Sequence, residues 1–180
     1  MKKIPLFCII LAFIMAFSSC SLIESVNDRR LQDTDNDAIN GVFGDFLTTL
    51  GNKNKDGMKK LFSKPARDND TDLDSMIDQL FESYKGKLKS YGLVKGPTVS
   101  SSFSYGDETE NMQAAYFVET TESYYHFLID CVTEDTVNPD NIGITSLHVK
   151  KGRADETDGI NWGDIDNEYG LILRRMDDII

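Results

Sequence analysis

Apolar side chains recur at helical spacing between residues 37 and 86. Repeats of three and four residues place such side chains along one face of a helix. We therefore predict helices over residues 37–50, 55–62 and 70–86. Pro65 is expected to stop the second helix and Gly86 to end the third, since both residue types terminate helices. Within the first helix, Gly41 and Gly44 lower helix stability and can admit a neighbouring element.

Beyond Gly86 the pattern changes to an alternation of apolar and polar residues, which is typical of half-buried strands. Strands are predicted over residues 88–94, 98–105, 112–121, 124–133 and 142–150. Turn-forming clusters at 106–108 and 138–140 separate neighbouring strands, and residues 168–174 can add an edge strand or a final turn. Helices followed by consecutive strands indicate an α+β fold. In this fold the N-terminal helices pack on a curved antiparallel sheet, which forms a cone with a pocket at its mouth.

The first 19 residues have the pattern of an export signal. Two lysines precede an uncharged apolar run over residues 4–17, which is shorter than the roughly 20 residues that a membrane-spanning helix needs. Two serines then stand before Cys20, an order that resembles the lipobox of bacterial lipoproteins, although the lipobox usually has leucine where this chain has Phe17. We predict cleavage before Cys20 and a diacylglyceryl group on its sulfur. The alternatives are a plain signal peptide and an uncleaved anchor.

The cysteine count agrees with this anchor. The chain has three cysteines: Cys8 in the leader, Cys20 at the predicted cleavage site, and Cys131. An exported domain that uses disulfides carries an even set, so no internal disulfide is expected. Residues 20–35 contain few apolar side chains and are predicted to tether the lipid to a single domain over residues 36–180.

The chain is strongly acidic, with a formal net charge of −11. Loss of the leader removes two lysines and no acidic residue, which brings the net charge to −13. The phosphates of nucleic acids repel such a domain, so we expect no nucleic-acid partner. The same charge is typical of the solvated surface of an exported domain.

Three stretches carry a family resemblance, namely residues 56–63 (DGMKKLFS), 72–81 (DLDSMIDQLF) and 84–86 (YKG). Together with the lipobox and the order of the elements, they are similar to an uncharacterised family of small Gram-positive bacterial lipoproteins. That family looks like a member of the nuclear-transport-factor-two-like (cystatin-like) cone fold, which ketosteroid isomerase also uses. The resemblance implies a fold and a location but no activity, because this fold serves both enzymes and binding modules.

No metal site is predicted. Residues 33–37 and 68–72 begin like calcium loops, but the later positions that require glycine and an acidic ligand hold other residues. His126 and His148 fall in predicted strands, and the third candidate zinc ligand, Cys131, alternates to the other face of its strand from His126. We interpret Cys131 as a small core residue, since no local motif supports a nucleophile.

The candidate pocket residues are Tyr84, Tyr116, His126 and Asp130. On a shared concave face, a carboxylate or imidazole beside a phenol can move a proton next to a carbonyl group. The other face of the fourth predicted strand is more hydrophobic and fits better against the helices; it carries Tyr125, Phe127, Ile129 and Cys131. Trp162, in a polar segment, is expected to plug the cone or to mark a contact surface.

The sequence therefore predicts an exported protein, held on the extracytoplasmic face of the cell membrane by the lipid on Cys20. No catalytic residue, cofactor or metal is assigned. The expected role is non-catalytic binding of a small ligand or an envelope protein. One alternative is a small enzyme of the isomerase or dehydratase type that uses the same pocket. Another is a purely structural lipoprotein with a filled core.

Overall fold

The computed structural model describes residues 20–152 and 170–174, with side chains over residues 33–152. The predicted leader and the segment that contains Trp162 lie outside the described residues. The helices are α2 (Cys20–Gly51), α3 (Lys55–Leu61), α4 (Lys64–Asn69) and α5 (Leu73–Ser83). The strands are β1 (Leu88–Ser104), β2 (Asp107–Thr120), β3 (Tyr124–Asp135), β4 (Gly143–Lys151) and β5 (Gly170–Arg174), with a short 3-10 turn (Pro139–Asn141) before β4.

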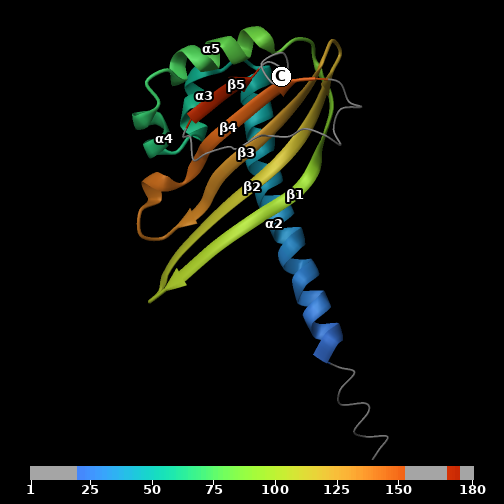
Figure 1. Ribbon diagram of the computed structural model, residues 1–180, viewed down its shortest axis with the longest axis vertical. Coiled ribbons are helices and arrows are strands. Elements are labelled where there is room, and N and C mark those ends of the chain that lie inside the picture. The colour runs from blue at the N-terminus through green and yellow to red at the C-terminus, as the bar shows by residue number, and fades with distance from the viewer. Residues whose placement is uncertain (1–19, 153–169, 175–180) are drawn as a thin grey trace, which may run out of the picture. The chain divides into compact units, whose positions relative to one another are not determined.

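The strands form one sheet in the order β1-β2-β3-β4-β5, and α5 lies across one end of it (Figure 1). β1 to β4 pair antiparallel with their neighbours in the chain, whereas β5 pairs parallel to β4. Tyr105 and Gly106 join β1 to β2 with φ angles of 53° and 96°, as a tight hairpin turn requires. The predicted α+β fold, with N-terminal helices and an antiparallel sheet, is confirmed.

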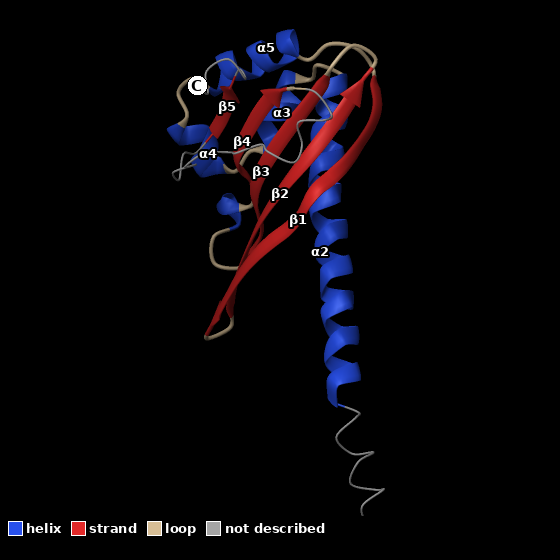
Figure 2. Ribbon diagram, turned by 45° about the vertical axis from the view of Figure 1, so that its right-hand side comes forward, coloured by secondary structure: helices blue, strands red, loops and turns tan. Residues whose placement is uncertain are grey.

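The strands predicted over residues 88–94 and 98–105 are a single long strand, β1, which twists along its length with β2 (Figure 2). The pairing of β1 with β2 changes register between Leu88 and Ser90 and again between Leu93 and Thr98. These irregularities carry the strand past Pro97, which has no N–H to donate. An edge strand tolerates such a proline. The predicted edge strand within residues 168–174 is confirmed as β5.

The helix predicted over residues 37–50 begins at Cys20, so the predicted tether is helical. The chain divides into two compact units after Asp37, and the sheet and the helices that follow α2 belong to the second unit. A Cβ atom added at Gly41 or Gly44 meets nothing within 4 Å. The expectation that these glycines admit a neighbouring element is therefore wrong. Among the helices that the structure describes, none is long and apolar enough to cross a membrane.

Pro65 lies in the first turn of α4, a helix that the sequence pattern did not predict. Ser63 caps α4, and its Oγ accepts a hydrogen bond from the backbone N–H of Ala66 at 3.3 Å. Proline suits the first turn because the N–H that it lacks has no helical partner there. Just before the cap, Phe62 forms an isolated parallel bridge with Ile144 of β4. The start of α4 therefore lies beside β4.

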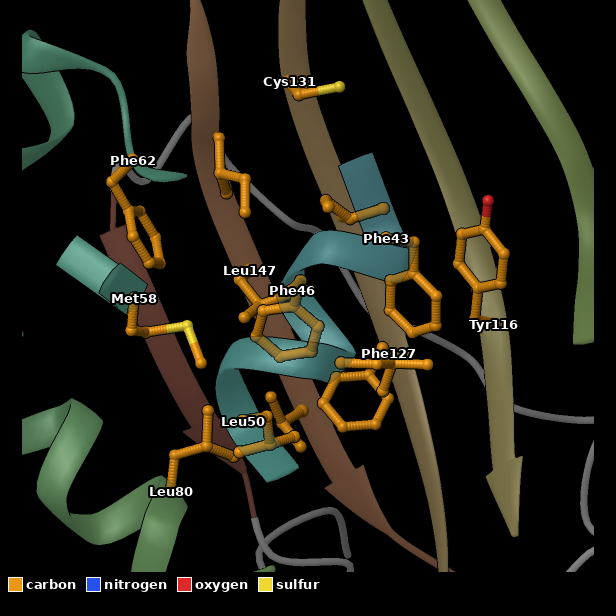
Figure 3. Close-up of a cluster of buried hydrophobic side chains, with 14 of the residues drawn as sticks. Phe43, Phe46, Leu50, Met58, Phe62, Leu80, Tyr116, Phe127, Cys131 and Leu147 are labelled. Atoms are coloured by element: carbon orange, nitrogen blue, oxygen red, sulfur yellow. The ribbon is translucent and has the colours of Figure 1, made fainter. Parts of the chain in front are cut away.

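The helices cover one face of the sheet with an aromatic core (Figure 3). Phe43 of α2 stacks on Tyr116 of β2, with 3.8 Å between the ring centroids, and meets the edge of Phe127 of β3 at 5.7 Å. Buried side chains from the other helices and the connection between α3 and α4 complete this cluster; they include Met58, Phe62, Ile77 and Leu80. The predicted apolar helix stripes thus pack against a single sheet face.

Candidate functional site

Two of the four predicted pocket residues lie inside the helix-covered core. Tyr116 is 1% exposed, and its hydroxyl donates a hydrogen bond to Oδ1 of Asn40 at 2.8 Å. The ring of Tyr84 lies 5.1 Å from that of Tyr125. Burial raises the pKa of both Tyr84 and Tyr116. These phenols are therefore protonated packing groups of the core.

The other two predicted residues, His126 and Asp130, lie on the opposite face of the sheet. Their neighbours Phe127 and Ile129 belong to the helix-side core, and successive side chains of a strand point to opposite faces. The hydrophobic set of β3 is thus confirmed as the inner face. The structure does not bring the four candidates together, because the period of two separates the tyrosines from His126 and Asp130.

His126 and His148 share the outer face but belong to different cross-strand pairs. His126 pairs with Lys150, and His148 pairs with Leu128. Cys131 lies in the core on the other face, where burial raises its pKa to about 12. Over the described residues, no three side chains of histidine, cysteine, aspartate or glutamate are placed to hold a metal ion.

A cavity of about 590 Å³ borders the sheet. Most of its strand residues belong to the outer face, and the core residues Met112 and Cys131 also contribute to its lining. Its floor includes a row of paired residues that crosses four strands, from β1 to β4: Thr98, Gln113, Asp130 and Ser146. A second row lies beside the first and consists of Ser100, Asn111 and Val132. The remaining lining residues come from the start of α4, from the turn after β3 and from the strands: Ser63, Pro65, Asp135, Asn141, Thr109, Met112, Cys131 and Thr145. Of the predicted pocket residues, Asp130 lines this cavity and the other three do not.

Asp130 stands at the centre of the floor and is held on both sides. Its Oδ1 accepts a hydrogen bond from Nε2 of Gln113, and its Oδ2 accepts one from the hydroxyl of Ser146, both at 2.7 Å. The hydroxyl of Thr145 donates to the backbone carbonyl of Asp130 at 3.2 Å. A register shift between β3 and β4 beside Asp130 adds Thr145 to this contact, as a bulge often does near a binding site.

Asp135 holds the turn that borders the cavity. Its Oδ1 accepts hydrogen bonds from the backbone N–H groups of Val137 and Asn138, at 3.0 and 2.7 Å. Its Oδ2 accepts one from Nδ2 of Asn141 at 2.8 Å. The backbone N–H of Asn138 and then the amide of Asn141 lower the pKa of Asp135. Asp135 therefore positions Asn141 on the cavity wall.

Among the described residues that line the cavity, the charged side chains are the two carboxylates, Asp130 and Asp135. Lysine, arginine, histidine and aromatic residues are absent from this described part of the lining. The carboxylate of Asp135 is used by the turn, whereas that of Asp130 receives two side-chain hydrogen bonds from neutral donors. A carboxylate has about four acceptor sites. Asp130 can therefore accept further hydrogen bonds from a ligand.

The partners of Asp130 were not predicted from the sequence. Gln113 lies on the solvent-facing side of an alternating strand, and Ser146 follows a register shift that no periodicity reveals. One feature of the sequence could have indicated a polar pair next to Asp130. The turn at Tyr105 and Gly106 fixes the pairing of β1 with β2. That register aligns Thr98 with Gln113 and so predicts a polar pair on the face opposite the core.

A family model described as a domain of unknown function (DUF5104) matches residues 45–154, more than half of the chain. The chain belongs to the DUF5104 family. The DUF5104 match runs from within α2 to just beyond β4 and includes all the described residues that line the cavity. No curated protein matches the sequence. Membership of an uncharacterised family, expected from the sequence motifs, is thus confirmed.

Proposed function

We propose that this DUF5104 protein is a lipid-anchored binding protein of the extracytoplasmic membrane face, and that its cavity holds a small polar ligand. The observation that carries the proposal is the row from Thr98 to Ser146, in which neutral donors hold the carboxylate of Asp130 inside a cavity of about 590 Å³. Ligand sites are typically concave, with a few polar groups that fix the orientation of the ligand.

The lining favours a hydroxylated ligand that is neutral or positively charged. Hydroxyl and amide side chains provide donors and acceptors on both rows of the floor. An ammonium group can pair with Asp130, because the described lining residues include no basic side chain that competes for that carboxylate. An anionic ligand meets repulsion from Asp130 and from a chain with a net charge of −11.

Binding without catalysis fits this geometry better than the isomerase or dehydratase alternative. That alternative needs an acid or base beside a phenol that stabilises an oxyanion. Asp130 lies on the outer face, whereas Tyr84 and Tyr116 lie in the core on the other side of the sheet. No tyrosine is among the described residues that line the cavity, so the described residues do not gather the groups of a proton-transfer site there.

The anchor and the detailed fold belong to the same proposal. The lipobox-like order before Cys20 supports a diacylglyceryl anchor, and two acyl chains hold a protein on a membrane durably. Helices that pack on one face of an antiparallel sheet support a nuclear-transport-factor-two-like cone. In this domain the core fills the helix side, so the proposed ligand uses the outer face.

Thermal unfolding of the detergent-solubilised full chain tests the ligand class. Glucosamine, glucose and glucuronate share a sugar ring and differ in charge. We expect glucosamine to raise the melting temperature most, glucose less, and glucuronate not at all. A ligand at 100 times its Kd adds about 2.7 kcal/mol to the stability of the folded state, which shifts the melting temperature by several degrees.

Asp130→Asn is the matched variant, since it removes the charge and keeps the shape. It should abolish the advantage of glucosamine over glucose. Asp45→Asn removes an exposed carboxylate of α2 outside the cavity and should leave that advantage intact. Equal responses of the wild type to all three sugars, or no response at all, would count against the cavity as a site for this ligand class.

Replacement of Cys20 by alanine tests the anchor separately. The variant should accumulate as an unlipidated precursor, whereas the wild type should carry label from a radioactive fatty acid. Unchanged processing and labelling of Cys20→Ala would refute lipidation at this residue and leave the cavity proposal untouched.

A further inference from the structure

β1 ends the sheet on one side. It pairs with β2 along one edge, and its other edge pairs with no strand among the residues that the structure describes. An exposed edge presents unpaired N–H and C=O groups and is a template for another strand. Proteins usually protect such edges with lysine, proline or irregular pairing.

The two halves of β1 differ in this protection. The first half carries Lys89, Lys95 and Pro97, together with every register shift in the pairing with β2. The second half, residues 98–104, pairs with β2 without a shift and contains neither proline nor charge. Protection therefore stops where the strand becomes regular.

The unprotected half belongs to an unusual stretch of this acidic chain. Residues 96–106 form the longest run without a charged residue in the part of the chain that the structure describes. The run also exposes two aromatic side chains, because Phe103 is 74% accessible and Tyr105 is fully accessible. Two copies of this strongly acidic chain repel least where this run faces itself.

We propose that a second copy of this chain pairs with β1 through residues 98–104, antiparallel and centred on Ser101. This register places Val99 opposite Phe103 of the second copy, on the same face of the joined sheet. A β-branched residue opposite an aromatic one is a favourable cross-strand pair. The serines at 100 and 102 face each other on the other side, so no like charges are opposed.

The pairing also bears on the cavity. Thr98 and Ser100 line it from β1, and the proposed register sets Ser104 and Ser102 of the second copy beside them. Each cavity then gains hydroxyl groups from the neighbouring chain at its β1 side. The inference about the edge is independent of the ligand, because it rests on strand regularity and charge alone.

Disulfide trapping of the full chain in its membrane tests the register. Opposite residues of an antiparallel pair have Cα atoms about 4.5–5.5 Å apart, which lies within the range of about 4.4–6.8 Å that disulfides bridge. Mild oxidation of Ser101→Cys should convert most of the protein to a covalent dimer. Ser90→Cys, an exposed position in the protected half of the same strand, should give no more dimer than the wild type.

A second variant tests the interaction without a cross-link. Ser101→Lys places two lysines opposite each other at the centre of the pair, whereas Ser101 is exposed and the fold has no need of its side chain. In sedimentation of the detergent-solubilised full chain, the wild type should have the mass of two chains and Ser101→Lys the mass of one. A single-chain mass for the wild type overturns the proposal. So does a dimer that Ser101→Lys leaves intact, or a cross-link from Ser101→Cys to a different protein.

Discussion

Replacement of Asp130 by alanine is expected to destabilise the domain measurably. The carboxylate accepts hydrogen bonds at 2.7 Å from Gln113 and from Ser146, which connect β3 to β2 and to β4. Alanine removes both acceptors at once. The side chains that lose their acceptor differ in burial, because Ser146 is 6% exposed and Gln113 is open to solvent.

The expected loss of stability follows from the difference in burial between Ser146 and Gln113. Water can replace the carboxylate as the acceptor for Gln113, so the loss of that bond costs little. The hydroxyl of Ser146 is left buried without its acceptor, and such a group costs about 1–3 kcal/mol. We therefore expect Asp130→Ala to lower the free energy of unfolding by about 1–3 kcal/mol. Asp130→Asn should cost at most about 1 kcal/mol, since its amide can bond to Gln113 through oxygen and to Ser146 through nitrogen.

Urea unfolding followed by circular dichroism measures these differences. Asp45→Ala serves as the control, because Asp45 is an exposed residue of α2. A surface change of this kind should stay within about 0.5 kcal/mol of the wild type. If Asp130→Ala unfolds at the same urea concentration as Asp45→Ala, the hydrogen-bonded row does not stabilise the sheet and the reasoning is refuted.

Three further predictions concern single residues elsewhere in the domain. Gly44→Ala should stabilise the domain by about 0.5–1 kcal/mol, because an added Cβ meets nothing within 4 Å. Gly86→Ala should destabilise it, because φ is +84° and the added Cβ lies 2.8 Å from the backbone nitrogen of Glu122. A melting temperature for Gly86→Ala at or above that of Gly44→Ala contradicts this prediction. Asp135 has a lowered pKa in the folded state, so it stabilises above the unfolded pKa of about 4 and this contribution is lost as the pH falls through the folded value. Acid titration of Asp135→Asn should accordingly show a shallower loss of stability below about pH 4 than the wild type, and identical slopes would refute it. Cys131 has its pKa raised to about 12 by burial, so iodoacetamide at pH 8 should modify it only after unfolding, and fast labelling of the folded chain would show that the thiol is accessible.

Much of the fold follows from local patterns. The stripe of α5 and the alternation in β3 are strong periodic signals, and both elements lie where they were predicted. Elements controlled by position in the sheet were harder to predict. α4 accepts Pro65 in its first turn, after the cap at Ser63, and the strand that contains Pro97 stays continuous because it lies at an edge. In both cases a residue that breaks local structure is tolerated by its surroundings.

Local patterns likewise predicted only part of the candidate site. Asp130 lines the cavity beside the sheet, whereas Tyr84, Tyr116 and His126, which were expected beside it, lie elsewhere. Alternation assigned His126 and Asp130 to a common face, and the more hydrophobic residues of the other face correctly indicated which face the helices cover. Alternation could not find the partners of Asp130, because strand pairing and bulges determine them.

By itself the sequence determined the acidic charge, the lipobox-like pattern before Cys20, and the order of helices and strands. These properties depend on composition or on neighbours within a few positions of one another. Only the tertiary structure decided that Thr98, Gln113, Asp130 and Ser146 form one row. The spacing of these residues in the sequence does not predict the row, because the register of each strand pair determines which side chains meet. A shift of one residue places a side chain on the opposite face.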